Sequence, residues 1–157
     1  GEDRIIYRRS EMFENETEPR SIHLAVDIWL PVLTPIFAPL PAVVHSFQDN
    51  NHFGDYGPTI ILEHKLNGVT FYTLYGHLSR DSLKELKVGK KIEQGQNIAR
   101  VGEYEENGNW PSHLHFQIIT DMLGRRGDFP GVTRPSEKEF YLRLCPDPNL
   151  ILRIVKC

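Results

Sequence analysis

Prolines and glycines interrupt this chain at short intervals. Its 157 residues include eleven prolines and twelve glycines, and long helical patterns are few. Because both residues favour turns and interrupt helices, this pattern predicts an all-β, turn-rich fold with few short helices. In residues 88–102, glycines alternate with short apolar stretches, which indicates small strands joined by tight turns, as in a compact barrel-like sandwich.

The length of the chain suits one domain that buries its own core. We interpret residues 1–20, which are charged and show little periodicity, as an N-terminal segment, and residues 21–157 as the domain. The 18 basic and 21 acidic residues are scattered, and the formal net charge is −3. A phosphate-binding face needs a basic patch, so this distribution argues against nucleic acid as a partner.

Cysteine content and hydropathy bear on the cellular compartment. Cys145 and Cys157 are too few for a disulfide framework and predict free thiols in a reducing compartment. No apolar run approaches the length of a membrane span, and the first thirty residues lack the apolar stretch of a signal peptide. These features favour a cytoplasmic location, with the periplasm or the cell surface as the alternative.

Two histidines stand two residues apart at the start of an alternating apolar stretch, residues 113–119. Alternation predicts a β-strand, which points the side chains of His113 and His115 to the same face. Imidazole is the commonest protein ligand for metals, and it exchanges protons near neutral pH. One imidazole can therefore hold a metal while its neighbour serves the chemistry beside it. The alternative is a surface strand that carries two histidines by chance.

A second alternating stretch covers residues 22–30, where the even positions are all apolar. This period of two predicts one strand with His23 and Asp27 on the same face and only the small Ala25 between them. An imidazole and a carboxylate in this arrangement fit half of a metal site. A hydrogen-bonded His–Asp pair without a metal is the alternative.

The middle of the chain predicts a β-hairpin. Residues 59–64 have the composition of a buried strand, Asn67-Gly68 is a strong turn signal, and residues 69–74 form the return strand. A polar loop at 48–58 precedes this hairpin.

Short helical elements are expected after the hairpin. We predict a helix at residues 81–86 with Ser79 as its cap, a long ordered loop at 121–133, and a last short element at 137–144.

A further histidine, His77, follows Gly76 at the end of the return strand. This position projects a side chain into a groove, although a hydrogen-bonded loop histidine fits the same pattern. We interpret His45, His52 and His64 as structural or solvent-exposed.

The separated motifs, taken together, resemble those of one enzyme family. In chain order they are His23-x-x-x-Asp27, His77 after Tyr-Gly, and His113-x-His115. This ordered combination resembles the lysostaphin-type (LytM-domain) zinc endopeptidases. The resemblance covers roughly residues 22–119 and includes the Thr-Pro-Ile-Phe-Ala-Pro run that begins at Thr34.

The resemblance implies a duplicated-hybrid-motif fold, with barrel-sandwich-like antiparallel sheets and a groove. It implies that His23, Asp27 and His115 hold Zn²⁺ and that His77 and His113 are catalytic histidines that do not bind the metal. The implied activity is hydrolysis of a peptide bond, and the usual family substrates are peptidoglycan cross-links, often next to glycine. The chain has no His-Glu-x-x-His helix that would supply a carboxylate base.

This ligand set agrees with the chemistry of hydrolysis. Two imidazoles and one carboxylate leave an open position on a tetrahedral Zn²⁺, where the pKa of a water falls from about 16 to about 7. A neutral histidine can accept the proton of this water, and a protonated one can stabilise the oxyanion or protonate the leaving amine. The spacing leaves open which of His77 and His113 does which.

The chain departs from the family pattern at several positions. Ala25 stands where glycine is frequent, and Gln117 stands where glutamate is common. Residues 105–112 replace a glycine-rich approach to the His-x-His strand. Because this loop borders the groove, its replacement concerns the choice of substrate.

A more extensive resemblance involves one bacterial branch of the family. It rests on residues 55–59, 71–79, 127–132 and 146–150, and so covers nearly the whole chain. In this branch the peptidase-like module lies between a kinase-like phosphotransferase domain and a class III aminotransferase in one polypeptide. It implies a cytoplasmic module with these fused domains, whose natural substrate need not be peptidoglycan.

Two further hypotheses use the same residues. The first is a zinc-binding, non-hydrolytic module with a structural or regulatory role beside a fused or partner enzyme; the sequence does not separate it from a peptidase. The second is a sugar-transport scaffold of similar topology, in which histidines relay phosphoryl groups.

Overall fold

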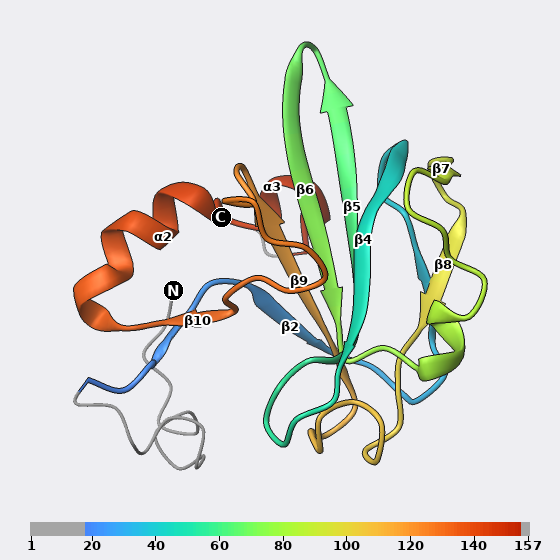
Figure 1. Ribbon diagram of the computed structural model, residues 1–157, viewed down its shortest axis with the longest axis horizontal. Helices are drawn as coiled ribbons and strands as arrows, with labels where there is room; N and C mark the ends of the chain where they lie inside the picture. Colours follow the sequence, from blue (N-terminus) through green and yellow to red (C-terminus); the bar gives the residue numbers. More distant parts are fainter. Residues whose placement is uncertain (1–17, 155–157) are drawn as a thin grey trace.

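The protein is built around a six-stranded antiparallel sheet (Figure 1). The computed structural model describes residues 18–154, so residues 1–17 of the predicted N-terminal segment and Cys157 lie outside the described part. The strands lie in the order β2 (Val26–Trp29), β9 (His113–Ile119), β6 (Val69–Gly76), β5 (Gly57–Leu66), β4 (Ala42–Asn50) and β7 (Lys91–Ile92). The β5–β6 hairpin projects beyond the other strands in Figure 1.

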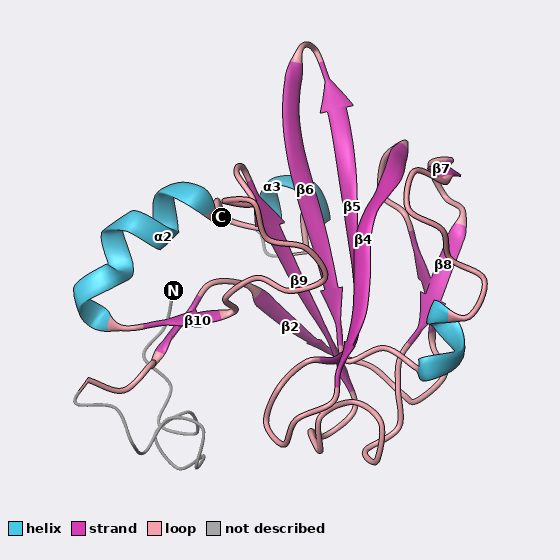
Figure 2. Ribbon diagram, viewed as in Figure 1, coloured by secondary structure: helices cyan, strands magenta, loops and turns pink. Residues whose placement is uncertain are grey.

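Smaller elements flank this sheet (Figure 2). Two-stranded antiparallel sheets form from β1 (Ile22–His23) with β10 (Val132–Thr133) and from β3 (Pro35–Phe37) with β8 (Asn97–Arg100). Within residues 18–154, the helical elements are η2 (Arg80–Leu83), η3 (Pro135–Glu137), α2 (Lys138–Leu144) and α3 (Asn149–Leu152). The predicted all-β class, with antiparallel sheets and few short helices, is confirmed.

Strand β9 divides the interior into two clusters because its side chains alternate between the two faces of the sheet. Its even-numbered residues, Leu114, Phe116 and Ile118, join a first core cluster that also contains side chains of β3 and β8. Its odd-numbered residues point to the other face, where Ile119 joins a second cluster. Each large apolar side chain buried in this way contributes roughly 1.5–3 kcal/mol to folding.

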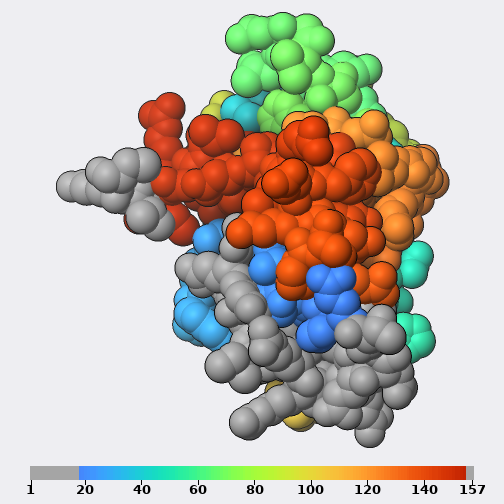
Figure 3. Space-filling model, turned by 90° about the vertical axis from the view of Figure 1, so that its left-hand side faces the viewer, coloured from blue at the N-terminus to red at the C-terminus, as the bar shows by residue number. Residues whose placement is uncertain are grey.

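The second face of the sheet is covered by the C-terminal segment, which we define as residues 127–145. Phe129 is fully buried there and packs with Tyr141 and Cys145 against the sheet residues Ile61 and Leu74. Figure 3 shows this segment, in orange to red, beside the blue residues that begin the described chain. The ordered loop predicted at 121–133 is present and ends in β10.

The predicted hairpin turn is present between β5 and β6. Asn67 and Gly68 both adopt positive φ angles, 50° and 80°. Two consecutive left-handed residues form the turn type that matches the twist of paired strands, and Asn-Gly is its preferred sequence.

The prediction of one strand over residues 22–30 is wrong. The chain bends at residues 24–25, so β1 pairs with β10 whereas β2 pairs with β9. At the bend, the backbone N–H of Leu24 donates to the carbonyl of Gly131 at 2.8 Å. Apolar alternation could not reveal this break because it depends on a partner more than one hundred residues away in the sequence.

Two boundaries also differ from the predictions. Strand β4 continues to Asn50, into the predicted polar loop, because it pairs with β5 as far as Gly57. The predicted helix at 81–86 is the short 3₁₀ turn η2, and Ser79 precedes it without a side-chain capping bond.

His64 is a structural histidine, as expected. Its Nδ1 lies 2.9 Å from the carbonyl oxygen of Pro41, and its Nε2 lies 2.8 Å from the hydroxyl of Thr73. The ring stacks on Phe71 with centroids 5.0 Å apart. Burial lowers the pKa of His64, although the hydrogen bond to Pro41 opposes this shift.

We predict that His64 makes the protein less stable in acid. An unfolded histidine takes up a proton below about pH 6.5, whereas the folded state resists protonation of His64, so the free energy of unfolding falls as pH decreases below this value. The slope contributed by one such group reaches about 1.4 kcal/mol per pH unit. Urea unfolding between pH 7.5 and 5 should show a shallower decline for His64→Gln. Parallel declines for the two proteins would contradict this prediction.

Candidate metal centre

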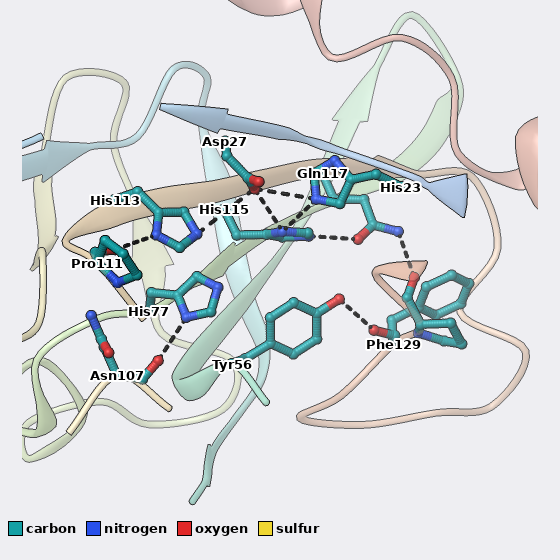
Figure 4. A network of polar contacts seen from close by, with 11 residues as sticks. His23, Asp27, Tyr56, His77, Asn107, Pro111, His113, His115, Gln117 and Phe129 are labelled. Atoms are coloured by element: carbon teal, nitrogen blue, oxygen red, sulfur yellow. Dashed lines mark hydrogen bonds and ion pairs between the residues drawn. The ribbon is translucent and has the colours of Figure 1, made fainter. Parts of the chain in front are cut away.

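Three predicted site residues meet beside the paired strands β2 and β9 (Figure 4). His23 Nε2 and His115 Nδ1 each lie 3.2 Å from Asp27 Oδ1, and the two nitrogens lie 3.3 Å apart. These atoms form a nearly equilateral triangle. Both imidazoles are buried, and the group could hold a metal ion.

The strand pairing explains why these residues meet. Asp27 of β2 stands directly opposite His115 of β9 in the antiparallel ladder, a position that brings the Cβ atoms of cross-strand partners to about 5 Å. His23 belongs to β1, and the bend at residues 24–25 turns its ring to the same point. The predicted face shared by His23 and Asp27 therefore exists, although a bend and not one strand creates it.

The Asp27 carboxyl is held in its charged form. Burial opposes ionisation, but the contacts with the ring nitrogens of His115 and His23 outweigh it and keep the pKa of Asp27 far below its ordinary value. A buried carboxylate that faces two imidazole nitrogens is a set of donor atoms that suits a divalent metal ion such as Zn²⁺.

His77 and His113 lie beside this triangle. Their ring centroids are 4.2 Å apart, and His113 Nε2 lies 3.9 Å from Asp27 Oδ1. Each ring places its Nδ1 against a backbone carbonyl: that of Asn107 at 2.7 Å for His77 and that of Pro111 at 2.6 Å for His113. Because a carbonyl can only accept, both Nδ1 atoms carry hydrogen, which leaves each Nε2 as the atom that exchanges protons.

His77 combines a strained backbone with an unfavourable setting for positive charge. Its φ angle is +61°, a left-handed conformation that costs a bulky residue about 1 kcal/mol or more. Burial, and after it the proximity of the His113 and His115 rings, lower the pKa of His77 well below its ordinary value. His77 is therefore neutral at neutral pH.

All five predicted residues line one cleft of about 510 Å³, a volume typical of ligand sites. Its other walls include aromatic rings and both signs of charge. These residues are Trp29, Tyr56, Trp110, Phe129 and Tyr141, with Arg20, Arg125, Arg134, Asp55, Asp128 and Glu137. His45, His52 and His64 are not among the residues that line it.

Two further residues contact the histidines; the sequence indicated Gln117 only as a departure from the family pattern and did not indicate Tyr56. Tyr56 donates its hydroxyl to the carbonyl of Phe129 at 3.0 Å, and its ring centroid lies 4.8 Å from that of His115. The Oε1 atom of Gln117 lies 3.1 Å from His115 Nε2. The period of two on β9 could have identified Gln117, whereas Tyr56 reaches the site from a loop without a recognisable spacing.

Comparisons with known proteins identify the family. The sequence model of peptidase family M23 matches residues 21–126. The chain belongs to peptidase family M23. None of the curated proteins compared matches it significantly.

Solved M23 structures have the same fold. The chain is similar to the catalytic domain of lysostaphin from Staphylococcus simulans, with 25% identity, a TM-score of 0.52, and coverage of 77% of this chain and 80% of that chain. The chain is also similar to LytU, with 25% identity, a TM-score of 0.51, and coverage of 84% of this chain and 80% of that chain. A third similar structure is the catalytic domain of the prophage-encoded M23 protein EnpA from Enterococcus faecalis. Its identity is 23%, its TM-score is 0.53, and the match covers 73% of this chain and 76% of that chain, so this likeness supports the fold alone.

Membership in family M23 supports peptidase activity in general, and M23 peptidases are metallopeptidases. The matched region contains all five predicted site residues and ends before the C-terminal segment. No helix within residues 18–154 combines the length and the apolar character that a membrane crossing requires. The comparisons do not test the predicted fusion to kinase-like and aminotransferase domains, which stays a prediction.

We predict that Asp27→Ala abolishes tight metal binding. Wild-type protein should gain about 3–4 kcal/mol of stability when Zn²⁺ exceeds its dissociation constant 100- to 1,000-fold, seen as a higher melting temperature than in EDTA. Asp27→Ala lacks one ligand and should melt at the same temperature with and without Zn²⁺. His52→Ala, an exposed histidine outside the cleft, is the control and should keep the full shift. Equal shifts in wild type and Asp27→Ala would contradict the site.

Proposed function

We propose that this M23 chain is a zinc-dependent endopeptidase that hydrolyses peptide bonds of peptidoglycan type. The observation that carries the proposal is the triangle of His23, Asp27 and His115, whose sides measure 3.2, 3.2 and 3.3 Å. Ligands bound to tetrahedral Zn²⁺ at about 2.0–2.1 Å are separated by about 3.3–3.4 Å. The donor atoms therefore fit this ion without rearrangement.

The number of protein ligands supports a catalytic metal ion and not a structural one. Catalytic zinc sites use three protein ligands and keep the fourth position for water or substrate, whereas structural sites use four. His23, Asp27 and His115 are the residues that we assign as ligands. When bound, Zn²⁺ supplies a Lewis acid and lowers the pKa of water to about 7.

His77 and His113 would manage the protons of the reaction. Both rings place Nδ1 against a backbone carbonyl, so any proton exchange would take place at Nε2 of each ring. Neutral His77 can accept a proton from the attacking water at Nε2, and a protonated imidazole can then stabilise the oxyanion or protonate the leaving amine. Their separation of 4.2 Å between ring centroids allows the two to share these tasks, and the structure favours neither order.

The substrate assignment rests on the family. Lysostaphin, one of the similar structures, is an antimicrobial peptidase, and the cleft of this chain is large enough for a peptide. Because aromatic rings and loop residues such as Trp110 line the cleft, its preferences need not match those of the similar structures. A cytoplasmic location and fused domains remain predictions that accompany this proposal.

We predict that His77→Ala and His113→Ala remove catalysis while metal binding is retained. Loss of a general acid or base typically lowers the rate 10²- to 10⁴-fold, and neither residue belongs to the ligand triangle. The measurement is cleavage of a panel of glycine-containing and peptidoglycan-derived peptides, followed by mass spectrometry, together with zinc analysis of each variant.

His52→Ala serves as the matched control and should cleave at the wild-type rate. The proposal fails if zinc-loaded wild type cleaves none of these peptides. This outcome, with zinc still bound, would favour the non-hydrolytic zinc-binding module instead.

A further inference from the structure

Gln117 connects a proposed metal ligand to the C-terminal segment. It lies on β9, two residues after His115, and is completely buried. Its Oε1 lies 3.1 Å from His115 Nε2, and its Nε2 donates to the carbonyl oxygen of Pro130 at 3.0 Å and to the sulfur of Cys145 at 3.2 Å. Figure 4 shows the amide between the ring of His115 and the C-terminal segment.

The Pro130 carbonyl decides how the Gln117 amide is oriented. A carbonyl oxygen can only accept a hydrogen bond, so the amide group that faces Pro130 at 3.0 Å must be the NH₂. The reverse orientation would press two acceptors together in a buried site, where an unsatisfied polar contact costs the most. The amide oxygen therefore faces His115.

The orientation of the amide places hydrogen on Nε2 of His115. Because Gln117 Oε1 is an acceptor at this distance, His115 Nε2 must carry hydrogen. With hydrogen on Nε2, the imidazole can bind a metal ion only through Nδ1, whereas without the ion the Asp27 carboxylate favours hydrogen on Nδ1. This is the nitrogen that lies 3.2 Å from Asp27 Oδ1 and 3.3 Å from His23 Nε2.

The thiol of Cys145 completes this arrangement. Cys145 is 3% exposed, and burial raises the pKa of its thiol to about 11, so the sulfur stays neutral beside the amide. The backbone N–H of Cys145 donates to the carbonyl of Tyr141 at the end of α2, which ties the sulfur to the helix.

The C-terminal segment also contacts the other histidine ligand. Val132 of β10 pairs with His23 of β1. Gly131, which precedes it, has no room for a side chain: a Cβ atom there would lie 3.0 Å from His115 Cε1 and would collide with the hydroxyl of Tyr56. Pro130, Gly131, Val132 and Cys145 all follow residue 126, where the family match ends.

We propose that Gln117, held by Pro130 and Cys145, is a positioning residue that presents the Nδ1 lone pair of His115 to the metal. The C-terminal segment is thereby part of the metal centre, although it lies beyond the residues that define the family. Outer partners of histidine ligands of this kind typically contribute 10- to 100-fold to metal affinity. The inference rests on the proposed metal role of His115, and its test does not require peptidase activity.

The first measurement is the tautomer of His115 in metal-free protein. Two-bond ¹H–¹⁵N spectra of protein labelled at histidine should show His115 protonated at Nε2 in wild type. Gln117→Leu removes the acceptor at Nε2 and should move the hydrogen of His115 to Nδ1, because the Asp27 carboxylate still faces that nitrogen. Gln117→Glu retains an acceptor for His115 and should keep the wild-type tautomer, although its second oxygen now faces the carbonyl of Pro130 and should lower the melting temperature.

The second measurement is zinc affinity by competition with a chromophoric chelator. Gln117→Leu should bind Zn²⁺ 10- to 100-fold more weakly than wild type, and Gln117→Glu should restore most of this loss. Thr73→Val is the matched control because Thr73 is also fully buried and hydrogen-bonded on the neighbouring strand, but it contacts His64 and Tyr75 instead of the centre. It should lower stability without changing zinc affinity.

The outcomes separate this inference from the proposed function. Wild-type zinc affinity and an unchanged His115 tautomer in Gln117→Leu would overturn the positioning role. An equal loss of affinity in Thr73→Val would show that general destabilisation, and not the amide, is responsible. Failure to cleave any peptide would reject the peptidase while leaving both of these measurements intact.

Discussion

Strand β9 pairs with β2 on one side and with β6 on the other, and this register places both the core and the candidate site. In one direction β9 supplies Leu114, Phe116 and Ile118 to the first core cluster, and in the other it presents His113, His115 and Gln117. The β2 pairing sets Asp27 opposite His115, and β6 pairs Gly76 with His115 just before His77. Because side chains alternate, a slip of one residue would expose the apolar set and scatter the site. Burial of the core therefore fixes the strand register that brings the side chains of the site together.

The site concentrates features that disfavour folding. A charged carboxylate is buried against imidazole nitrogens, and His77 adopts a left-handed backbone conformation beside another histidine. Surrounding structure must offset these costs, because each amounts to a sizeable part of the small net stability of a domain. The backbone carbonyls of Asn107 and Pro111 hold the two outer rings. Such a collection of unfavourable contacts is typical of functional sites and is difficult to explain as a purely structural feature.

The C-terminal segment packs against one side of the candidate site. It covers the second face of the sheet with Phe129 and Cys145, pairs β10 with the strand of His23, and receives the amide of Gln117. Family M23 is recognised from residues 21–126 alone. The structural unit is therefore larger than the family match, since His23 pairs with Val132 and the Gln117 amide that faces His115 donates to Pro130.

The amino-acid sequence was enough to predict the all-β class and the hairpin at Asn67-Gly68, because turn preferences and strand alternation are local properties, whereas the set of five site residues came from the resemblance to a family. The spacing of His113 and His115 was enough to put both on one face of a strand. The folded protein alone reveals that residues 22–30 bend, that β4 continues to Asn50, and that Tyr56 and Gln117 contact His115. These features depend on partners that are distant in the chain, such as Gly131 for Leu24 and Pro130 for Gln117. No local pattern encodes such pairings, because they arise when the sheet faces are buried together.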